Sequence, residues 1–365
     1  MRVMPLYLKN PDWYYEDEEG IYRVKNNAPD EAKRSYIDFH KDDDCCPDSK
    51  AGIIGLAIGD AMGVPLEFFK REVFVENPVT EMTGNSSHNM PKGSWSDDTS
   101  LNIALVDSIN KNNGEINFKD IGEKFVKWMF EGEYTPTGET FGIGRRCLQS
   151  ISRIKEGKLN PEECGGTGKF DNGNGSLMRI LPIAYYCFSK WDYKEDDHEI
   201  YDVVKKVSSL THAHEISIMA CYIYVKFAIE LFYGKDLKQA YTYIQSLDYK
   251  YFSEDCKSNF KRILNNNIYE YYSDEISSLG YVVDTLEATL WTLLTTDNYD
   301  SAIIKAINLG NDADTVGACV GGLAGIFYGF DTINDTWKKD LIKYEYLADL
   351  CNTFNDVLFY SYICR

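Results

Sequence analysis

Two short acidic segments, far apart in the chain, carry the residues best suited to chemistry. They are GSWSDDTSL, residues 93–101, and GNDADTVGA, residues 310–318. In each segment two aspartates stand beside hydroxyl side chains and directly precede apolar residues at helical spacing. These aspartates are Asp97 and Asp98 in the first segment and Asp312 and Asp314 in the second. The pattern predicts two helix N-termini that each present a pair of carboxylates.

Two interpretations of these acids remain open, helix capping and metal binding. Capping needs one Ser, Thr, Asp or Asn side chain per helix start, for about 0.5–2 kcal/mol of stabilisation. Four carboxylates exceed that need. If the two helix starts meet, repulsion among the acids demands a counter-charge, and Mg²⁺ or Mn²⁺ binds carboxylate, hydroxyl and water oxygens. An EF-hand is excluded, because Val316 and Leu323 occupy loop positions where ligands belong.

The elements that must position these acids are predicted to be helices. Apolar residues from Ala51 onward recur at helical spacing, as in residues 118–129. Strand-like alternation is rare, and REVFVENPVTEMT, residues 71–83, is the best candidate strand. We therefore expect an all-α fold of roughly ten or more helices. Within GLAIGDAMG, residues 55–63, we interpret the glycines and Asp60 as residues for close helix packing.

Composition divides the chain into two parts. Residues 1–48 are polar and acidic with interleaved aromatic residues, and they are predicted to form an N-terminal extension. Within this extension, APDEAKRSYIDF at residues 28–39 favours a short helix, and DDDCCPDSK at residues 42–50 is typical of a linker. Residues 49–365 are predicted to form the main helical domain.

Net charge and cysteine usage exclude several classes of protein. The formal net charge of −19 argues against a nucleic-acid or anionic-membrane partner. The ten cysteines lack C-x-x-C spacing, so neither a zinc site nor a disulfide framework is expected. The first residues contain no apolar signal region, and no apolar run is long enough to span a bilayer. We expect a cytoplasmic protein with reduced thiols.

Six segments resemble those of a known family, the ADP-ribosylglycohydrolases, which include the dinitrogenase-reductase-activating glycohydrolases and the ADP-ribosyl-acceptor hydrolases. They occur in the family's order: GLAIGDAMGVPLEF, GSWSDDTSL, NGNGSLMRILPIA, THAHE, GYVVDTLEATLW and LGNDADTVGACVGGLAGIFYG. The resemblance spans residues 51 to 330 approximately. It implies a compact, orthogonal all-α bundle with two divalent cations, Mg²⁺ or Mn²⁺.

The resemblance also implies a role for individual residues. The implied metal ligands are Ser96, Asp97, Asp98, Asp312, Asp314 and Thr315, with Ser96 standing where many members carry threonine. Glu67 and Asp97 are the implied acid/base residues, Glu67 being also a candidate ligand. The implied substrate-binding residues are Asn172, Gly173, Asn174, Gly175, Ser176, His212 and Tyr281. For the glycines physical chemistry agrees, since they permit close backbone approach and free N–H groups at the start of a following helix, where phosphates bind.

Together these features predict a hydrolase that removes ADP-ribose from a modified protein side chain, arginine being the favoured linkage. Such an enzyme could give immunity against an ADP-ribosylating toxin. The alternative is a binding protein whose N-terminal extension occludes an ADP-ribosyltransferase, through Trp13, Tyr14, Tyr15 and Tyr22 beside the acids of residues 16–19. A protein that binds ADP-ribose without hydrolysis is a third alternative. The acceptor residue, the choice between Mg²⁺ and Mn²⁺, and the oligomeric state do not follow from the sequence.

Overall fold

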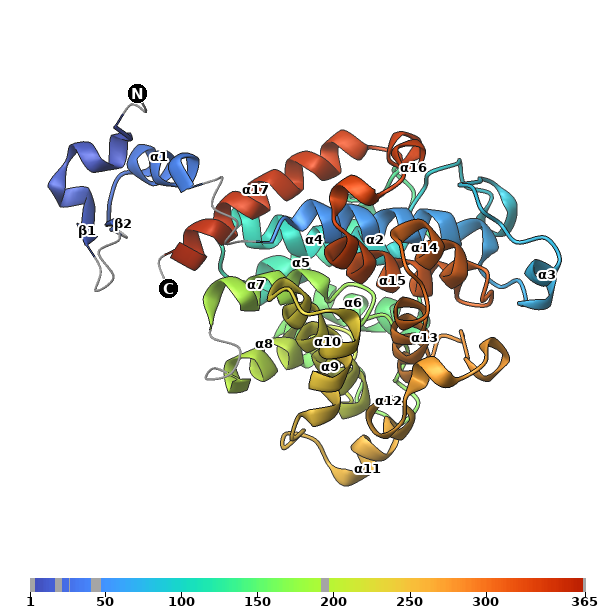
Figure 1. The fold of residues 1–365 in the computed structure, drawn as a ribbon. Helices are drawn as coiled ribbons and strands as arrows, with labels where there is room; N and C mark the ends of the chain where they lie inside the picture. The colour runs from blue at the N-terminus through green and yellow to red at the C-terminus, as the bar shows by residue number, and fades with distance from the viewer. Residues whose placement is uncertain (1–3, 17–21, 26, 41–46, 192–196, 364–365) are drawn as a thin grey trace.

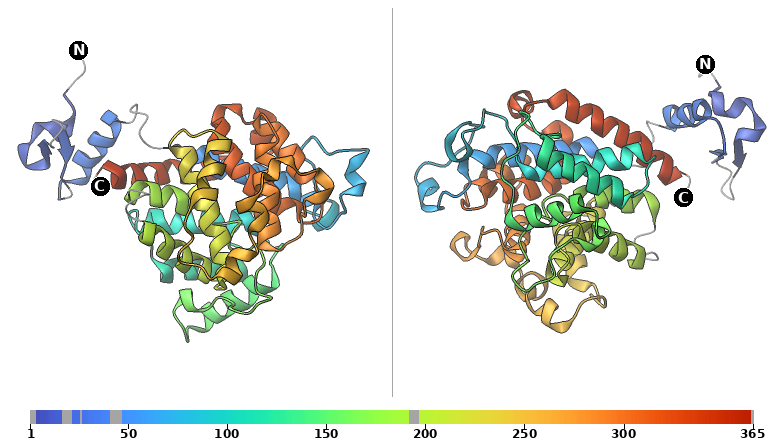
Figure 2. Two further views of the ribbon diagram at one scale, coloured as in Figure 1. Left: turned by 60° about the horizontal axis from the view of Figure 1, so that its bottom comes forward. Right: turned by 180° about the vertical axis from the view of Figure 1, so that it is seen from behind.

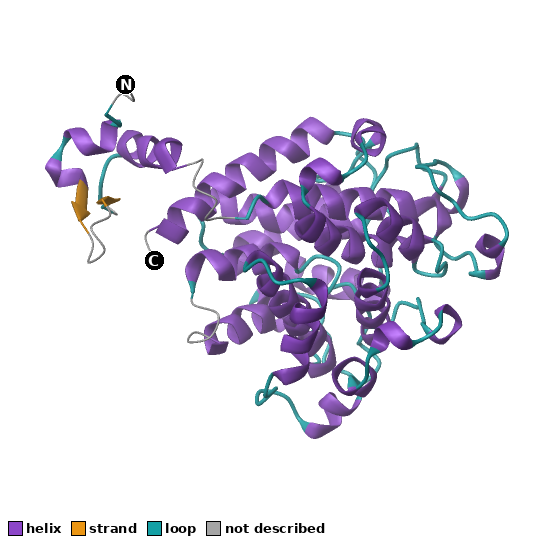
Figure 3. Ribbon diagram, viewed as in Figure 1, coloured by secondary structure: helices purple, strands orange, loops and turns teal. Residues whose placement is uncertain are grey.

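The computed structural model describes residues 4–16, 22–25, 27–40, 47–191 and 197–363. Helices dominate the described residues, and Figure 3 shows that strands occur there only in the N-terminal segment. The prediction of an all-α fold is confirmed. The helices are α1 Asp30–His40, α2 Ser49–Gly63, α3 Glu72–Val75, α4 Asp97–Lys111, α5 Phe118–Glu131, α6 Arg145–Glu156, α7 Leu181–Lys190, α8 Asp197–Ser209, α9 Glu215–Phe232, α10 Leu237–Ser246, α11 Glu254–Ser258, α12 Lys261–Asn265, α13 Val282–Leu294, α14 Tyr299–Ile307, α15 Ala313–Tyr328, α16 Asp335–Asp340 and α17 Tyr344–Ile363.

Helices α2 and α15 lie side by side at the centre of the main domain (Figure 1). Their close approach has a clear cause in the sequence. Gly59 packs against the carbonyl oxygen of Gly317, and Gly55 packs against that of Gly321, so that each backbone occupies space that a side chain would fill. Both helices are apolar, and nearly every residue of α2 is buried. The interpretation of these glycines as packing residues is confirmed.

Replacing Gly59 by alanine should therefore destabilise the main domain. The added Cβ would collide with the Gly317 carbonyl, and such overpacking costs about 1–3 kcal/mol. Urea denaturation followed by circular dichroism would measure the loss. Gly144→Ala is the matched control, because Gly144 has a negative φ and no neighbouring atom within 4 Å of the added Cβ. Equal stability of the two variants would contradict this account of the helix pair.

The segment predicted as a strand, residues 71–83, is not one. It contains the short helix α3 followed by irregular chain. A strand needs a partner, whereas the described backbone here bonds to a side chain: Val79 N–H donates to Asn308 Oδ1 at 2.8 Å, and Asn308 Nδ2 donates to the Val79 carbonyl at 2.8 Å. Val73 and Val75 are exposed, so the alternation of apolar and polar residues in this segment does not produce a buried face.

The N-terminal segment, residues 1–48, has a small core of its own. Strands β1 (Tyr14–Glu16) and β2 (Tyr22–Val24) pair antiparallel, and α1 confirms the helix expected within residues 28–39. The buried residues Tyr7, Val24, Ala28, Ala32 and Tyr36 pack with Phe359 of α17. Figures 1 and 2 place the segment beside the C-terminal end of α17, away from the other helices.

The boundary between the two parts coincides with the start of α2 at Ser49, although the division into two domains stays a prediction. Residues 42–46 of the expected linker lie outside the described residues, and its last two residues belong to α2. The seven described cysteines are free thiols. Among the described residues, no helix has the length and apolar character needed to cross a bilayer.

Candidate metal centre and substrate cleft

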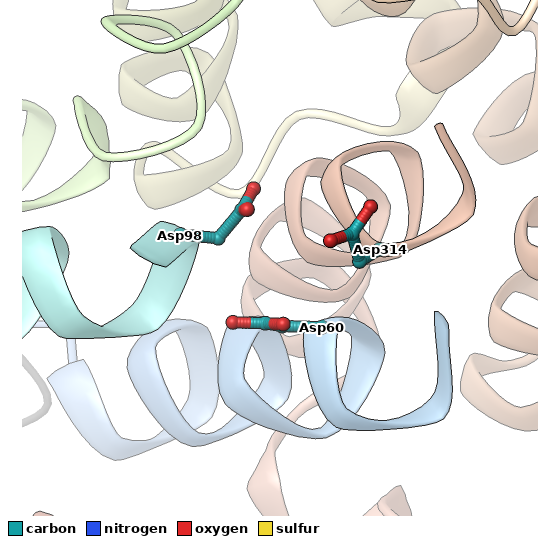
Figure 4. A group of neighbouring side chains, drawn as sticks. All are labelled: Asp60, Asp98 and Asp314. Atoms are coloured by element: carbon teal, nitrogen blue, oxygen red, sulfur yellow. The ribbon is translucent and has the colours of Figure 1, made fainter. Parts of the chain in front are cut away.

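The two acidic helix starts meet. Asp98 at the start of α4 and Asp314 at the start of α15 lie with Asp60 of α2 so that one carboxylate oxygen of each is within 4.8 Å of the others. Figure 4 shows these three carboxylates, from three different helices, around one space. A second group joins Glu67, Asp312 and Asp314 within the same 4.8 Å limit. The two groups share Asp314, so they form one acidic cluster with two adjacent centres.

The start of α4 is held by Asp60, whose function the sequence analysis missed. Its carboxylate accepts hydrogen bonds from Ser96 N–H at 2.9 Å, from Thr99 N–H at 3.0 Å and from Thr99 Oγ1 at 2.6 Å. Asp60 is fully buried, so helix packing alone does not describe it. An acid in the middle of an otherwise apolar helix was the available signal. Through these hydrogen bonds, Asp60 orients the segment that carries Asp97 and Asp98.

Capping does not account for the acids. At the start of α4 the Ser96 side chain accepts from Asp98 N–H at 3.3 Å and also donates to Asp98 Oδ2 at 2.9 Å, so Ser96 is the cap. At the start of α15 the N-cap Asp312 makes no capping bond through its side chain with a described residue. Its carboxylate instead accepts from Asn174 Nδ2 at 2.7 Å. Neither the Asp98 nor the Asp312 carboxylate acts as the helix cap, so both remain available as metal ligands.

The cluster is electrostatically strained without a counter-charge. Burial, and then the surrounding carboxylates, hold the pKa values of Asp97, Asp98 and Asp314 well above their ordinary value. Burial likewise raises the pKa of Asp312, and it raises that of Asp60 to about 6. Asp98 Oδ1 is buried and has no hydrogen-bond partner among the described residues. Hard oxygen donors that repel one another and include an unpartnered atom fit a divalent cation.

Two unusual backbone conformations bring Glu67 and Asp312 together. Phe68 and Asn311, the neighbours of these acids, have φ values of +70° and +59°. Phe68 N–H donates to the Asn311 carbonyl at 2.7 Å, and Asn311 N–H donates to the Phe69 carbonyl at 2.7 Å. A positive φ is rare for a bulky side chain such as that of Phe68, and such strain is typical of functional sites. The two hydrogen bonds hold the neighbours of both acids together at the cluster.

A cleft of about 220 Å³ opens from the acidic cluster. Its acidic lining consists of Glu67, Asp97, Asp312, Asp314 and Thr315. The same cleft is lined by Arg145, Arg146, His212 and residues 173–175. The cleft therefore suits a ligand that carries both anionic groups and metal-binding hydroxyl groups.

The loop of residues 172–176 lies over the start of α13. Asn174 N–H donates to the Gly280 carbonyl at 3.2 Å, and Gly173 pairs with Tyr281 in an isolated bridge. One expectation was wrong: the loop does not lead directly into a helix, because α7 begins only at Leu181 after a series of turns. Any anion bound here must use loop N–H groups or side chains.

Asn172 and Ser176 are not among the residues that line the cleft, and their binding of substrate stays a prediction. Ser217 Oγ donates to Asn172 Oδ1 at 3.0 Å, and Ser208 Oγ donates to Ser176 Oγ at 3.0 Å. Both side chains are buried in these contacts. The Asn172 and Ser176 side chains anchor the loop to Ser217 and Ser208, whereas Gly173, Asn174 and Gly175 line the cleft. The sequence cannot distinguish the two orientations, because the partners are remote.

His212 is a buried residue of the cleft lining, close to Gly173 and Gly175. Its Nδ1 is 2.9 Å from Thr211 Oγ1. Burial, and then the charge of Arg179, lower its pKa to about 3, so the ring is neutral at pH 7. It can therefore exchange hydrogen bonds with a ligand but adds no charge. Tyr281 is 36% exposed beside the loop and does not line this cleft.

Arg146 and Arg179, which the sequence analysis did not select, add positive charge near the loop, as Arg145 does in the cleft lining. Arg179 is fully buried, and its guanidinium donates to the carbonyls of Gly175 and, at 3.2 Å, Val207. Arg146 lines the cleft and forms an ion pair with Asp171. Arg179 thus fixes the loop and places a positive charge beneath it, favouring an anionic ligand.

Comparisons with known proteins show what the chain resembles in sequence and in fold. A sequence model described as ADP-ribosylglycohydrolase matches residues 48–361. The chain is 31% identical to an ADP-ribosylarginine hydrolase, Tri1, of Serratia proteamaculans, over 83% of this chain and 77% of that protein. It is 29% identical to the ADP-ribosyl-[dinitrogen reductase] glycohydrolase of Rhodospirillum rubrum, over 79% and 88%. A solved structure, an ADP-ribosylglycohydrolase-related protein complex, matches with a TM-score of 0.69 and 25% identity, over 84% of this chain and 97% of that one.

Proposed function

Because this chain belongs to the ADP-ribosylglycohydrolase family, we propose that it removes ADP-ribose from a modified protein side chain by hydrolysis. The observation that carries the proposal is the meeting of two acidic helix starts, through Asp98 and Asp314, beside a cleft that is also lined by Arg145, Arg146 and His212. We propose an arginine linkage, because the relative of 31% identity is named for ADP-ribosylarginine.

In the acidic cluster, Asp98, Asp312, Asp314 and Glu67 would hold two divalent cations, with Ser96 and Thr315 contributing hydroxyl oxygens. A bound Mg²⁺ or Mn²⁺ supplies Lewis-acid polarisation and a more acidic water. Thr315 Oγ1 donates to Asp98 Oδ2 at 3.5 Å, and this contact joins the two helix starts. Geometry favours Asp60 as the residue that orients α4, because both its oxygens already accept hydrogen bonds.

The catalytic groups of the chain are Glu67 and Asp97, which face the cleft. A carboxylate on either side of the ribose C1″ carbon can take a proton from the attacking water and return one to the departing side chain. The backbone of residues 173–175, the neutral His212 and the charge of Arg146 would bind the diphosphate and ribose. Tyr281, half-exposed beside the loop, is the candidate for stacking on adenine.

The linkage is tested by offering arginine-, serine- and cysteine-linked ADP-ribosyl proteins to the enzyme. Released ADP-ribose is measured by chromatography with Mg²⁺, with Mn²⁺ and with chelator. We expect release from the arginine-linked protein in the presence of either metal. Release from none of the three proteins would refute the hydrolase, whereas release from another linkage would correct the acceptor alone.

A second function, capture of an ADP-ribosyltransferase toxin, is favoured by the N-terminal segment. The family match begins at residue 48, so the segment is additional to the family's common domain. Its hairpin exposes Tyr15 and Tyr22, which are 47% and 43% accessible, next to acidic residues. Aromatic anchors with negative charge suit a basic, nucleotide-binding cleft. Blocking a toxin and reversing its modification would together make an immunity protein, which we propose acts in the cytoplasm.

Deletion of residues 1–45 separates the two functions. We expect the truncated protein to lose toxin binding while keeping ADP-ribose release close to that of the full chain, because the cleft lies wholly within residues 67–315. Calorimetric titration with the toxin measures binding, and ADP-ribose release measures hydrolysis. Undiminished binding would remove the occlusion hypothesis. Tyr15→Ser with Tyr22→Ser, in the full chain, controls for effects on the end of α17.

A further inference from the structure

His88 lies next to Glu67, one of the residues that line the cleft. Its Nε2 contacts Glu67 Oε2, and both side chains are largely buried. A carboxylate only accepts hydrogen bonds, so Nε2 donates. Among the described residues, no other hydrogen-bond donor to the Glu67 carboxylate occurs. One oxygen of this acid is therefore held by His88, while the acid also belongs to the group with Asp312 and Asp314.

The turn that carries His88 is strained. His88 ends the 3₁₀ helix η4 (Ser86–His88), and three residues around it have positive φ: Asn85 at +61°, Ser86 at +60° and Asn89 at +53°. A bond of 2.6 Å from Asn85 N–H to the carbonyl of Met90 closes the turn. Such conformations persist only when the surrounding structure maintains them, and they concentrate at functional sites.

Two aromatic rings fix the orientation of the His88 ring. Its centroid is 5.6 Å from that of Phe68 and 5.2 Å from that of Phe141, and both pairs are tilted. Phe68 is also one of the strained residues that join Glu67 to Asp312. The backbone of Glu67 is thus fixed on one side, and its side chain is fixed through His88 on the other.

We propose that His88 is a positioning residue that keeps Glu67 at the metal centre. Glu67 has three rotatable side-chain bonds, and repulsion from Asp312 and Asp314 drives its carboxylate toward solvent. The hydrogen bond from His88 opposes this movement, and it turns the second oxygen of Glu67 toward the cluster. For catalysis this inference rests on the proposed hydrolase function, but for metal binding it does not.

Three substitutions separate the hydrogen bond from ring packing. His88→Gln keeps a donor without the ring, His88→Phe keeps a ring without the donor, and His88→Ala removes both. We expect kcat to fall about 10–100-fold in His88→Phe and His88→Ala, the usual effect of losing a residue that orients a ligand, and to recover largely in His88→Gln. KM should change by less than about threefold, because the residues proposed to bind the diphosphate are unchanged. Thermal unfolding checks that each variant folds.

The second measurement is the affinity for Mn²⁺, determined by calorimetry on the purified full-length protein. We expect it to weaken about 10–100-fold in His88→Phe and His88→Ala and to stay near wild type in His88→Gln. Wild-type behaviour of His88→Phe, or equal losses in His88→Gln and His88→Ala, would overturn the inference. If wild type releases no ADP-ribose but the Mn²⁺ affinities follow the expected order, the hydrolase proposal fails and the role of His88 stands. If wild type binds no Mn²⁺, both fail.

Discussion

Replacing Asp314 by asparagine should lower kcat/KM for ADP-ribose release by roughly 10³-fold or more, since Lewis-acid stabilisation is worth several kcal/mol and 1.36 kcal/mol is tenfold in rate. This large loss of activity is expected because Asp314 belongs to both groups of the acidic cluster. The same change should stabilise the metal-free protein. Burial and neighbouring carboxylates raise the pKa of Asp314, and a neutral amide removes that repulsion.

Opposite effects on activity and stability distinguish a ligand from a structural residue. Kinetics with excess Mn²⁺ measure the first effect, and urea denaturation in the presence of chelator measures the second. Asp300→Asn is the matched control, because burial also raises the pKa of Asp300, which bonds to Asn334 away from the cleft. We expect near-normal activity in that control. Near-normal activity in Asp314→Asn, or a loss of stability without metal, would contradict the assignment.

Removing divalent cations should stop hydrolysis and leave a protein whose stability falls as pH rises above about 4. Burial raises the pKa of Asp60 from 3.8 to about 6, so the folded state holds its proton more tightly than the unfolded state does. The favourable contribution is complete below the unfolded pKa, and it is lost as pH rises through the folded pKa. Asp97, Asp98 and Asp314 extend this loss to higher pH, because their pKa values are also raised.

Thermal unfolding between pH 4 and pH 8 tests this linkage. With chelator, the Tm of wild type should fall with pH relative to that of Asp314→Asn, because the variant has one charge fewer in the cluster. Added Mn²⁺ should restore the wild-type Tm, most strongly at high pH, where protons no longer compete for the carboxylates. Full activity in chelator, or parallel pH profiles for the two proteins, would show that the cluster does not need a counter-charge.

The features that the sequence predicted are those encoded locally. Acids beside hydroxyl residues, followed by apolar residues at helical spacing, identified the starts of α4 and α15 without knowledge of the fold. Small residues at four-residue spacing in α2 indicated close packing. Both signals lie within one or two helical turns, where sequence pattern and structure are directly linked.

The features that the sequence did not reveal depend on distant contacts. The Asp60 carboxylate accepts hydrogen bonds from Ser96 and Thr99, which lie 36 and 39 residues away in the sequence. His88 contacts Glu67, which is 21 residues away, from a turn with positive φ angles. The orientation of Ser176, in a turn, likewise depends on Ser208 of helix α8. The local sequence shows which residue stands at such a position, but tertiary packing decides in which direction its side chain points.

Anomalous diffraction from crystals grown with Mn²⁺ and ADP-ribose tests the central claim most directly. The account predicts two anomalous peaks, one between Asp98 and Asp314 and one among Glu67, Asp312 and Asp314, with ribose hydroxyl groups facing both. Crystals that contain ADP-ribose in the cleft but show no manganese within reach of these carboxylates would contradict it.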